Sequence, residues 1–117
     1  MDYQSLYDKA MKISPAIRFA TITDVNGKIK QSGHRKGVKS LITPQESRQS
    51  LKLSATMWKA RRKLSRKIGR GRYALAEYEK LKRIVLPLGN YHLLYLTTSA
   101  RADHAKIISK AIRLRLK

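Results

Sequence analysis

The sequence predicts an α+β fold in which a five-stranded antiparallel sheet is flanked by helices, in the order α-β-β-α-β-β-β-α. Short apolar segments separated by turn residues predict the strands. Longer segments with apolar residues three and four positions apart predict the helices. The chain has 117 residues, 42% of them hydrophobic, which suffices for one domain over residues 1–117 with its own core.

The first predicted elements are a helix at residues 2–13 and two strands at residues 17–23 and 28–32. The helix has one apolar stripe, formed by Leu6, Ala10 and Ile13. It ends before Pro15, because the residue preceding a proline is disfavoured in helical conformation. The Asn26-Gly27 pair between the strands favours a tight hairpin turn, since both residue types tolerate positive φ angles.

A long central helix is predicted next. Thr43 is a suitable N-cap, Pro44 suits the first helical position, and Glu46 completes a capping box. The helix is expected to run to Ile68 and to end at Gly69, because glycine commonly adopts the left-handed conformation that follows a helix.

Helical geometry divides this central helix into three faces. The expected core stripe consists of Leu53, Met57, Ala60, Leu64 and Ile68. A basic face on roughly the opposite side consists of Arg48, Lys52, Lys59, Lys63 and Arg66. A separate apolar patch consists of Leu51, Ala55 and Trp58. This patch is either an edge of the core or a subunit contact, and we predict a dimer interface because exposed apolar patches usually meet a partner.

The second half of the chain is predicted to contain strands at residues 70–79, 82–88 and 91–98 and a closing helix at residues 103–116. For residues 73–83 a helix is the alternative, because alanine, leucine, glutamate and lysine favour helices. The core face of the closing helix is expected to consist of Ile107, Ile108, Ala111, Ile112 and Leu114. Its basic face is expected to consist of Lys106, Lys110, Arg113 and Lys117.

Charge is the most unusual property of the chain. It has 27 lysines and arginines against 7 acidic residues, a net charge of +20, which favours a polyanionic partner. No acidic residue occurs between Glu46 and Glu77, so salt bridges along the helix do not account for the basic run. A solvated basic face is the alternative. The predicted phosphate contacts are Arg48, Lys52, Lys59, Arg61, Arg62, Lys63, Arg66, Lys67, Arg70 and Arg72, with Arg35 and Lys36 from the loop before the central helix.

Four tyrosines raise the question of base stacking, namely Tyr73, Tyr78, Tyr91 and Tyr95. Packing within the sheet is the more common role of strand tyrosines, and stacking on nucleic-acid bases is the alternative. The basic closing helix also resembles those that lie on anionic membranes, but it lacks the tryptophan or phenylalanine that usually anchors them. We therefore predict no membrane partner.

Enzyme chemistry is not predicted. The chain has no cysteine, its three histidines are scattered, and no metal-ligand spacing, nucleophile motif or phosphate-binding glycine loop occurs. We expect no catalytic residue, no metal and no cofactor. The N-terminus lacks a signal peptide and no apolar run is long enough to span a membrane, so a cytoplasmic protein is expected.

Several segments together resemble the roadblock/dynein light-chain family, and its small archaeal members most closely. They are Ile17-Arg18-Phe19-Ala20-Thr21-Ile22, Asn26-Gly27-Lys28, Leu41-Ile42-Thr43-Pro44-Gln45-Glu46 and Leu93-Leu94-Tyr95-Leu96. The resemblance covers nearly the whole chain and implies a roadblock/profilin-like fold. It also implies homodimers that pair through the middle helix and the third strand, where Leu51, Ala55 and Trp58 would lie, and a role as an adaptor or small-GTPase regulator.

The charge departs from that family pattern, because two copies of a basic middle helix would repel each other. The sequence therefore favours a homodimeric, non-enzymatic protein that binds nucleic acid through its phosphates without reading sequence. DNA is favoured, as in an architectural protein of the nucleoid, and RNA is the close variant. The alternative is a roadblock-type adaptor or GTPase regulator that binds other proteins.

Overall fold

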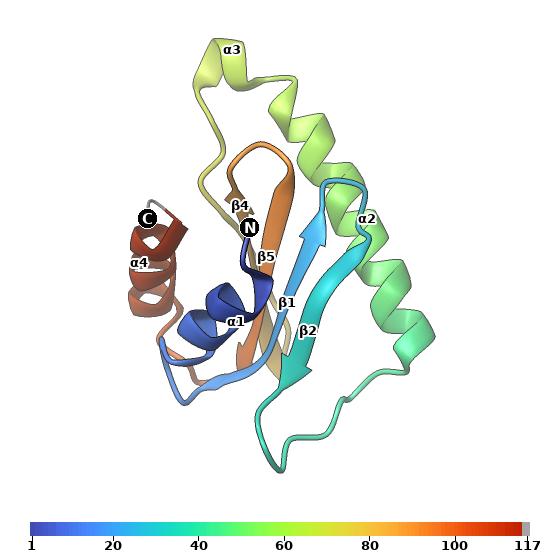
Figure 1. The fold of residues 1–117 in the computed structure, drawn as a ribbon, viewed down its shortest axis with the longest axis vertical. Coiled ribbons are helices and arrows are strands. Elements are labelled where there is room, and N and C mark those ends of the chain that lie inside the picture. The colour runs from blue at the N-terminus through green and yellow to red at the C-terminus, as the bar shows by residue number, and fades with distance from the viewer. Residues whose placement is uncertain (116–117) are drawn as a thin grey trace.

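The computed structural model describes residues 1–115 and has the predicted order of elements, with one additional short helix (Figure 1). The elements are α1 (Tyr3–Met11), β1 (Ile17–Asp24), β2 (Ile29–His34), α2 (Pro44–Arg62), α3 (Ser65–Ile68), β3 (Ala74–Glu77), β4 (Leu81–Leu88), β5 (His92–Ser99) and α4 (His104–Arg115). The predicted end of the closing helix at Leu116, and the predicted basic residue Lys117, lie outside the described residues.

The five strands form one antiparallel sheet in the order β2-β1-β5-β4-β3, so β2 and β3 are its edges. Helices α1 and α4 cover one face, and α2 lies across the other (Figure 1). Asp24 at the end of β1 is paired with His92 at the start of β5. The β1–β2 turn and the β4–β5 turn therefore lie at the same end of the sheet.

The main core lies between the sheet and helices α1 and α4. Its strand residues include Ile17, Ile22, Ile84, Leu86 and Leu96, each fully buried. The predicted helix stripes supply the other wall: Ala10, Ile107, Ile108 and Ala111 are buried, and Leu6, Ile13, Ile112 and Leu114 pack against them. Because β5 has a neighbour on each side and a helix on each face, its central residues form one continuous apolar run.

The orientation predicted for the central helix is wrong. Leu51, Ala55 and Trp58 face the sheet and are at most 4% exposed, where they pack against Val85, Leu93 and Tyr95. The expected core stripe is instead turned to solvent, with Leu53 63% and Met57 46% exposed. Burying the row that contains the tryptophan removes a large aromatic surface from water. The other stripe also extends to Leu64 and Ile68, which lie beyond the end of α2.

The central helix ends earlier than predicted. Helix α2 stops at Arg62, and α3 follows as a separate four-residue helix rather than as its continuation. Past Trp58 the next position on the buried face is Arg62, so no apolar side chain holds a further turn against the sheet. Gly69 follows α3 with a positive φ of 89°, as its residue type predicts, but its ψ of 172° is outside the left-handed helical region.

The predicted start of α2 is confirmed. The Thr43 hydroxyl accepts a hydrogen bond from the Glu46 amide at 3.1 Å, and the Glu46 carboxylate accepts one from the Thr43 amide at 2.8 Å. The third strand is shorter than the predicted 70–79 segment. The helical alternative for residues 73–83 is wrong, because β3 and β4 pair there as a hairpin.

The β1–β2 turn differs in detail from the predicted type. Gly27 has a φ of 87°, whereas Asn26 is not among the residues with positive φ. The Asp24 carboxylate accepts hydrogen bonds from the amides of Asn26 and Lys28, at 2.9 and 3.0 Å, which supports a wider turn. A Cβ atom on Gly27 would meet the Lys52 Cα atom at 3.2 Å, so this glycine also lets the turn approach α2.

Candidate functional site

The outward face of α2 carries an apolar stripe that the structure leaves uncovered. We define the outward stripe as Leu53, Met57 and Ala60 on α2 together with Leu64 just past its end, all exposed. Leu51, Ala55 and Trp58, the predicted dimer contacts, are buried against the chain's own sheet and are not available to a second molecule. The two stripes lie on opposite sides of the helix at 100° per residue, so the outward stripe is the surface that a partner would meet.

Two hydrogen bonds show which flank of α2 faces which edge of the sheet. Lys59 donates to the Asn26 side chain, so its flank faces the β1–β2 turn. Arg83 in β4 donates to the Ser50 hydroxyl, so the other flank faces β4 and the edge strand β3. The outward stripe therefore runs between a basic flank and an open sheet edge.

The flank beside the β1–β2 turn collects four of the predicted phosphate contacts. We call Arg48, Lys52, Lys59 and Lys63 the cationic flank; they lie within about 60° of one another around the helix and are all exposed. Arg61 is exposed but lies on the opposite flank by the same arithmetic. The structure therefore separates this arginine from the set with which it was predicted.

The cationic surface continues beyond α2. We call Arg62, Arg66, Lys67, Arg70 and Arg72 the cationic connection; it runs through α3 to the start of β3 and all five side chains are exposed. In Figure 1 this segment extends past the end of the sheet. The Arg62 guanidinium donates to the Asn90 carbonyl oxygen at 2.9 Å, which links the connection to the β4–β5 turn.

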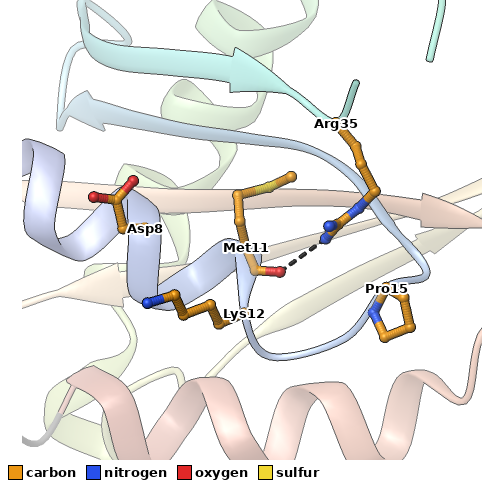
Figure 2. Close-up of a pocket in the computed structure, with 5 residues that line it drawn as sticks. All are labelled: Asp8, Met11, Lys12, Pro15 and Arg35. Carbon is orange, nitrogen blue, oxygen red and sulfur yellow. Dashed lines mark hydrogen bonds between the residues drawn. The ribbon is translucent and has the colours of Figure 1, made fainter. Parts of the chain in front are cut away.

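Arg35, a predicted phosphate contact, is engaged within the fold. Its guanidinium donates to the carbonyl oxygens of Ile17 and Met11, each at 2.8 Å, and of Ser14 at 3.0 Å. Figure 2 shows Arg35 directed at the end of α1, beside a surface depression of about 440 Å³. The side chain thus caps the carbonyl end of α1. Lys36 is exposed but follows β2 at the end of the sheet remote from Lys59.

The four tyrosines are placed very differently. Tyr95 is 2% exposed and lies under α2, where burial raises the pKa of its phenol above 10.0 because the charged form would lose hydration. Tyr73, Tyr78 and Tyr91 are 48%, 56% and 73% exposed. Tyr95 therefore has the packing role that the sequence favoured for strand tyrosines. Tyr91 is the most exposed of the four.

The carboxylate of Asp24 is the acidic group nearest in sequence to Asn26 and Lys28. Burial by itself raises the pKa of this carboxyl group. The amide hydrogen bonds from Lys28 and Asn26 and the positive charges of Lys30 and Lys28 lower it, and together they outweigh burial, so the pKa lies below the usual value of 3.8. The Asp24 carboxylate is thus ionised, and it accepts its hydrogen bonds from amides of its own turn. It organises the turn that Lys59 contacts.

Within residues 1–115, no three side chains of histidine, cysteine, aspartate or glutamate are arranged to hold a metal ion. No helix in that range combines the length and apolar character that crossing a bilayer requires.

Sequence reasoning missed the place where Lys59, Arg62 and the two turns meet. The turn residues Asn26, Asn90 and Tyr91 are separated in the chain from α2, and no sequence pattern indicates that they lie beside it. Their proximity follows only from the strand register and from the path of α2 over the sheet.

Solved structures share this fold over nearly the whole chain. The gliding protein MglB of Thermus thermophilus matches with a TM-score of 0.77 at 18% identity, over 96% of this chain and 82% of that one. A Roadblock/LC7 domain from Streptomyces avermitilis matches with a TM-score of 0.75 at 16% identity, over 99% and 93%. Profilin IA of Acanthamoeba castellanii matches with a TM-score of 0.66 at 12% identity, over 97% and 94%.

The sequence itself matches no protein-family model and no curated protein. The structural matches confirm the expected fold, an α+β arrangement of roadblock/profilin type. At these identities they establish the architecture alone.

Proposed function

We propose, because the chain has the fold of the Roadblock/LC7 domain, that it is a non-enzymatic protein-binding module of the adaptor or small-GTPase-regulator kind that acts as a homodimer. The observation that carries the proposal is the outward stripe of α2. Three of its residues, Leu53, Met57 and Leu64, are between 46% and 63% exposed. An uncovered stripe of this kind on a central helix is typical of an interface.

A second copy of the chain is the partner that fits this stripe. The β3 edge has unpaired backbone groups beside the Ser50 flank of α2, so one two-fold contact could cover both the edge and the stripe. The cationic flank faces the β1–β2 turn, away from that edge. Pairing on the β3 side keeps the two cationic flanks apart and leaves Arg61 as the helix cation on the paired side, which reduces the repulsion expected for two chains of charge +20. An MglB protein of the same fold has a tetrameric arrangement.

Sedimentation velocity of Met57→Glu tests this proposal. The wild-type chain is expected to sediment as a particle of twice 13.4 kDa, and the variant as a monomer, because a carboxylate in the stripe would be desolvated on pairing. The matched control is Leu41→Glu, since Leu41 is 57% exposed in the loop before α2. A wild-type monomer at tens of micromolar, or a Met57→Glu dimer, would contradict the proposal.

Nucleic-acid binding is a second proposed function, and one observation favours it. Every cation of the cationic flank and the cationic connection is exposed, and no acidic residue occurs between Glu46 and Glu77. Cations spaced along such a surface suit the phosphates of DNA or RNA and need no base contact. Sequence-independent DNA binding of the nucleoid type is the form we propose, with RNA as the variant.

The salt dependence of binding to random duplex DNA tests this second function. If about 6–8 phosphate contacts form, the slope of log K against log salt is expected to be about −5 to −7. Changing Arg66, Lys67 and Arg70 to glutamine should weaken binding and make the slope shallower by about one per lost contact. The matched control changes Lys106, Lys110 and Arg113 on α4 to glutamine, which removes the same charge from the other face. Equal losses in both triple variants would contradict a specific surface.

A further inference from the structure

The end of the sheet beside the cationic connection brings together three segments that are far apart in the chain. The Val25 amide in the β1–β2 turn donates to the Tyr91 carbonyl oxygen at 3.0 Å, which joins the two turns. Arg62 at the end of α2 donates to the Asn90 carbonyl oxygen at 2.9 Å. Lys59, one helical turn earlier, donates to Asn26. Figure 1 shows both turns and the end of α2 at this same end of the molecule.

Tyr91 is the aromatic side chain at this end. Its side chain is 73% exposed, whereas its backbone carbonyl is hydrogen-bonded to the β1–β2 turn. An exposed ring is therefore carried by an anchored backbone. An isolated exposed aromatic is ordinary on a protein surface. Tyr91 differs because the carbonyl oxygen of the residue before it accepts a hydrogen bond from Arg62, which holds a guanidinium group against the backbone next to the exposed tyrosine.

The acidic side chain of the β1–β2 turn is held by the turn itself. The Asp24 carboxylate accepts hydrogen bonds from two amides of its own turn. The positive charges of Arg62, Lys59 and the neighbouring Lys63 are exposed. The local charge therefore favours an anionic ligand.

We propose that this end of the sheet binds single-stranded nucleic acid, with one base stacked on the Tyr91 ring and the adjoining phosphates at Arg62, Lys63 and Lys59. The proposal deepens the second function above and rests on it. An unpaired base presents its flat face to an aromatic ring, whereas the bases of a duplex are already stacked on one another. A ring beside a row of cations matches the alternation of base and phosphate along a single strand.

Fluorescence anisotropy with a labelled oligothymidine and with a random duplex, at one salt concentration, tests this proposal. Tyr91→Ala is expected to weaken binding of the single strand by about 5- to 150-fold, the range measured for losing one stacked base. Its affinity for the duplex should stay unchanged. Tyr91→Phe keeps a stacking ring and should retain the affinity for the single strand.

Tyr78→Ala is the matched control. Tyr78 is 56% exposed in the β3–β4 turn, at the opposite end of β4 from Tyr91 and next to Glu77 and Glu79. It should bind the single strand as the wild type does. Thermal melting by circular dichroism verifies that each variant is folded.

The outcomes separate this inference from the function on which it rests. If Tyr91→Ala binds the single strand like the wild type while the triple variant at Arg66, Lys67 and Arg70 does not, base stacking on Tyr91 is wrong and nucleic-acid binding stands. If the wild type binds neither oligonucleotide at low salt, both are wrong. A loss in Tyr78→Ala equal to that in Tyr91→Ala also contradicts the site.

Discussion

Replacing Trp58 by alanine removes the largest of the three side chains that attach α2 to the sheet. Trp58 is 4% exposed and shares its patch with Leu51 and Ala55 on the helix. Truncation of a buried tryptophan typically costs about 3–5 kcal/mol, from lost burial and from the cavity left behind. The segment around Gly71 packs against the Trp58 side chain, since a Cβ atom added at Gly71 would lie 3.4 Å from the indole ring. Because this exposed segment can move inward, we expect the lower part of that range, about 3–4 kcal/mol.

Urea unfolding followed by far-ultraviolet circular dichroism measures this loss, since the variant has no tryptophan fluorescence. Wild type and variant are compared at one protein concentration, because dimerisation adds to apparent stability. The matched control is Met57→Ala, one residue earlier on the outward stripe, which should cost less than about 1 kcal/mol in dilute protein. If Trp58→Ala loses less than about 1 kcal/mol and sediments as a monomer, the tryptophan is an interface residue and the burial argument is wrong.

Three further variants probe individual contacts. Arg35→Met should destabilise the fold by about 2–3 kcal/mol, because three carbonyl oxygens lose a charged donor, and Arg35→Lys should restore only part of this in urea unfolding. Gly27→Ala should cost about 1–2 kcal/mol in the same assay, because φ is 87° and the new Cβ atom would crowd Lys52. Tyr95→Phe removes the hydroxyl bond to the Leu51 carbonyl, 3.4 Å long, and the hydroxyl's contacts with Ser54 and Thr23, and should flatten the loss of stability at high pH.

The sign of the last effect follows from the raised pKa of Tyr95. The folded state holds the phenolic proton to a higher pH than the unfolded state does. The stabilisation is therefore complete below the unfolded pKa of about 10 and is lost as pH rises through the folded pKa. Unfolding measured from pH 8 to 11 should show wild type losing more stability than Tyr95→Phe. Parallel curves would mean that Tyr95 ionises freely in the fold.

Local patterns were sufficient for most of the secondary structure. The capping box at Thr43 and Glu46, the glycine of the β1–β2 turn and the stripes of α1 and α4 depend on neighbours within four residues, so the sequence contains the needed information. The apolar run of residues 93–96 likewise predicted a strand, and the structure adds that this strand is buried on both faces. The density of cations between Lys59 and Arg72 is also a property of sequence alone.

The tertiary structure decided which face of each element is used. A helical wheel separates the Trp58 row from the Met57 row, but both are apolar, and only the side chains of Val85, Leu93 and Tyr95 on the sheet determine which row is buried. The role of Arg35 was equally hidden, because the carbonyl oxygens it binds come from residues at least 18 positions away. The hydrogen bond between Arg62 and Asn90 in the β4–β5 turn joins residues 28 positions apart. Both residues are polar and neither has a local pattern that predicts the contact, so it depends on strand register and helix packing together.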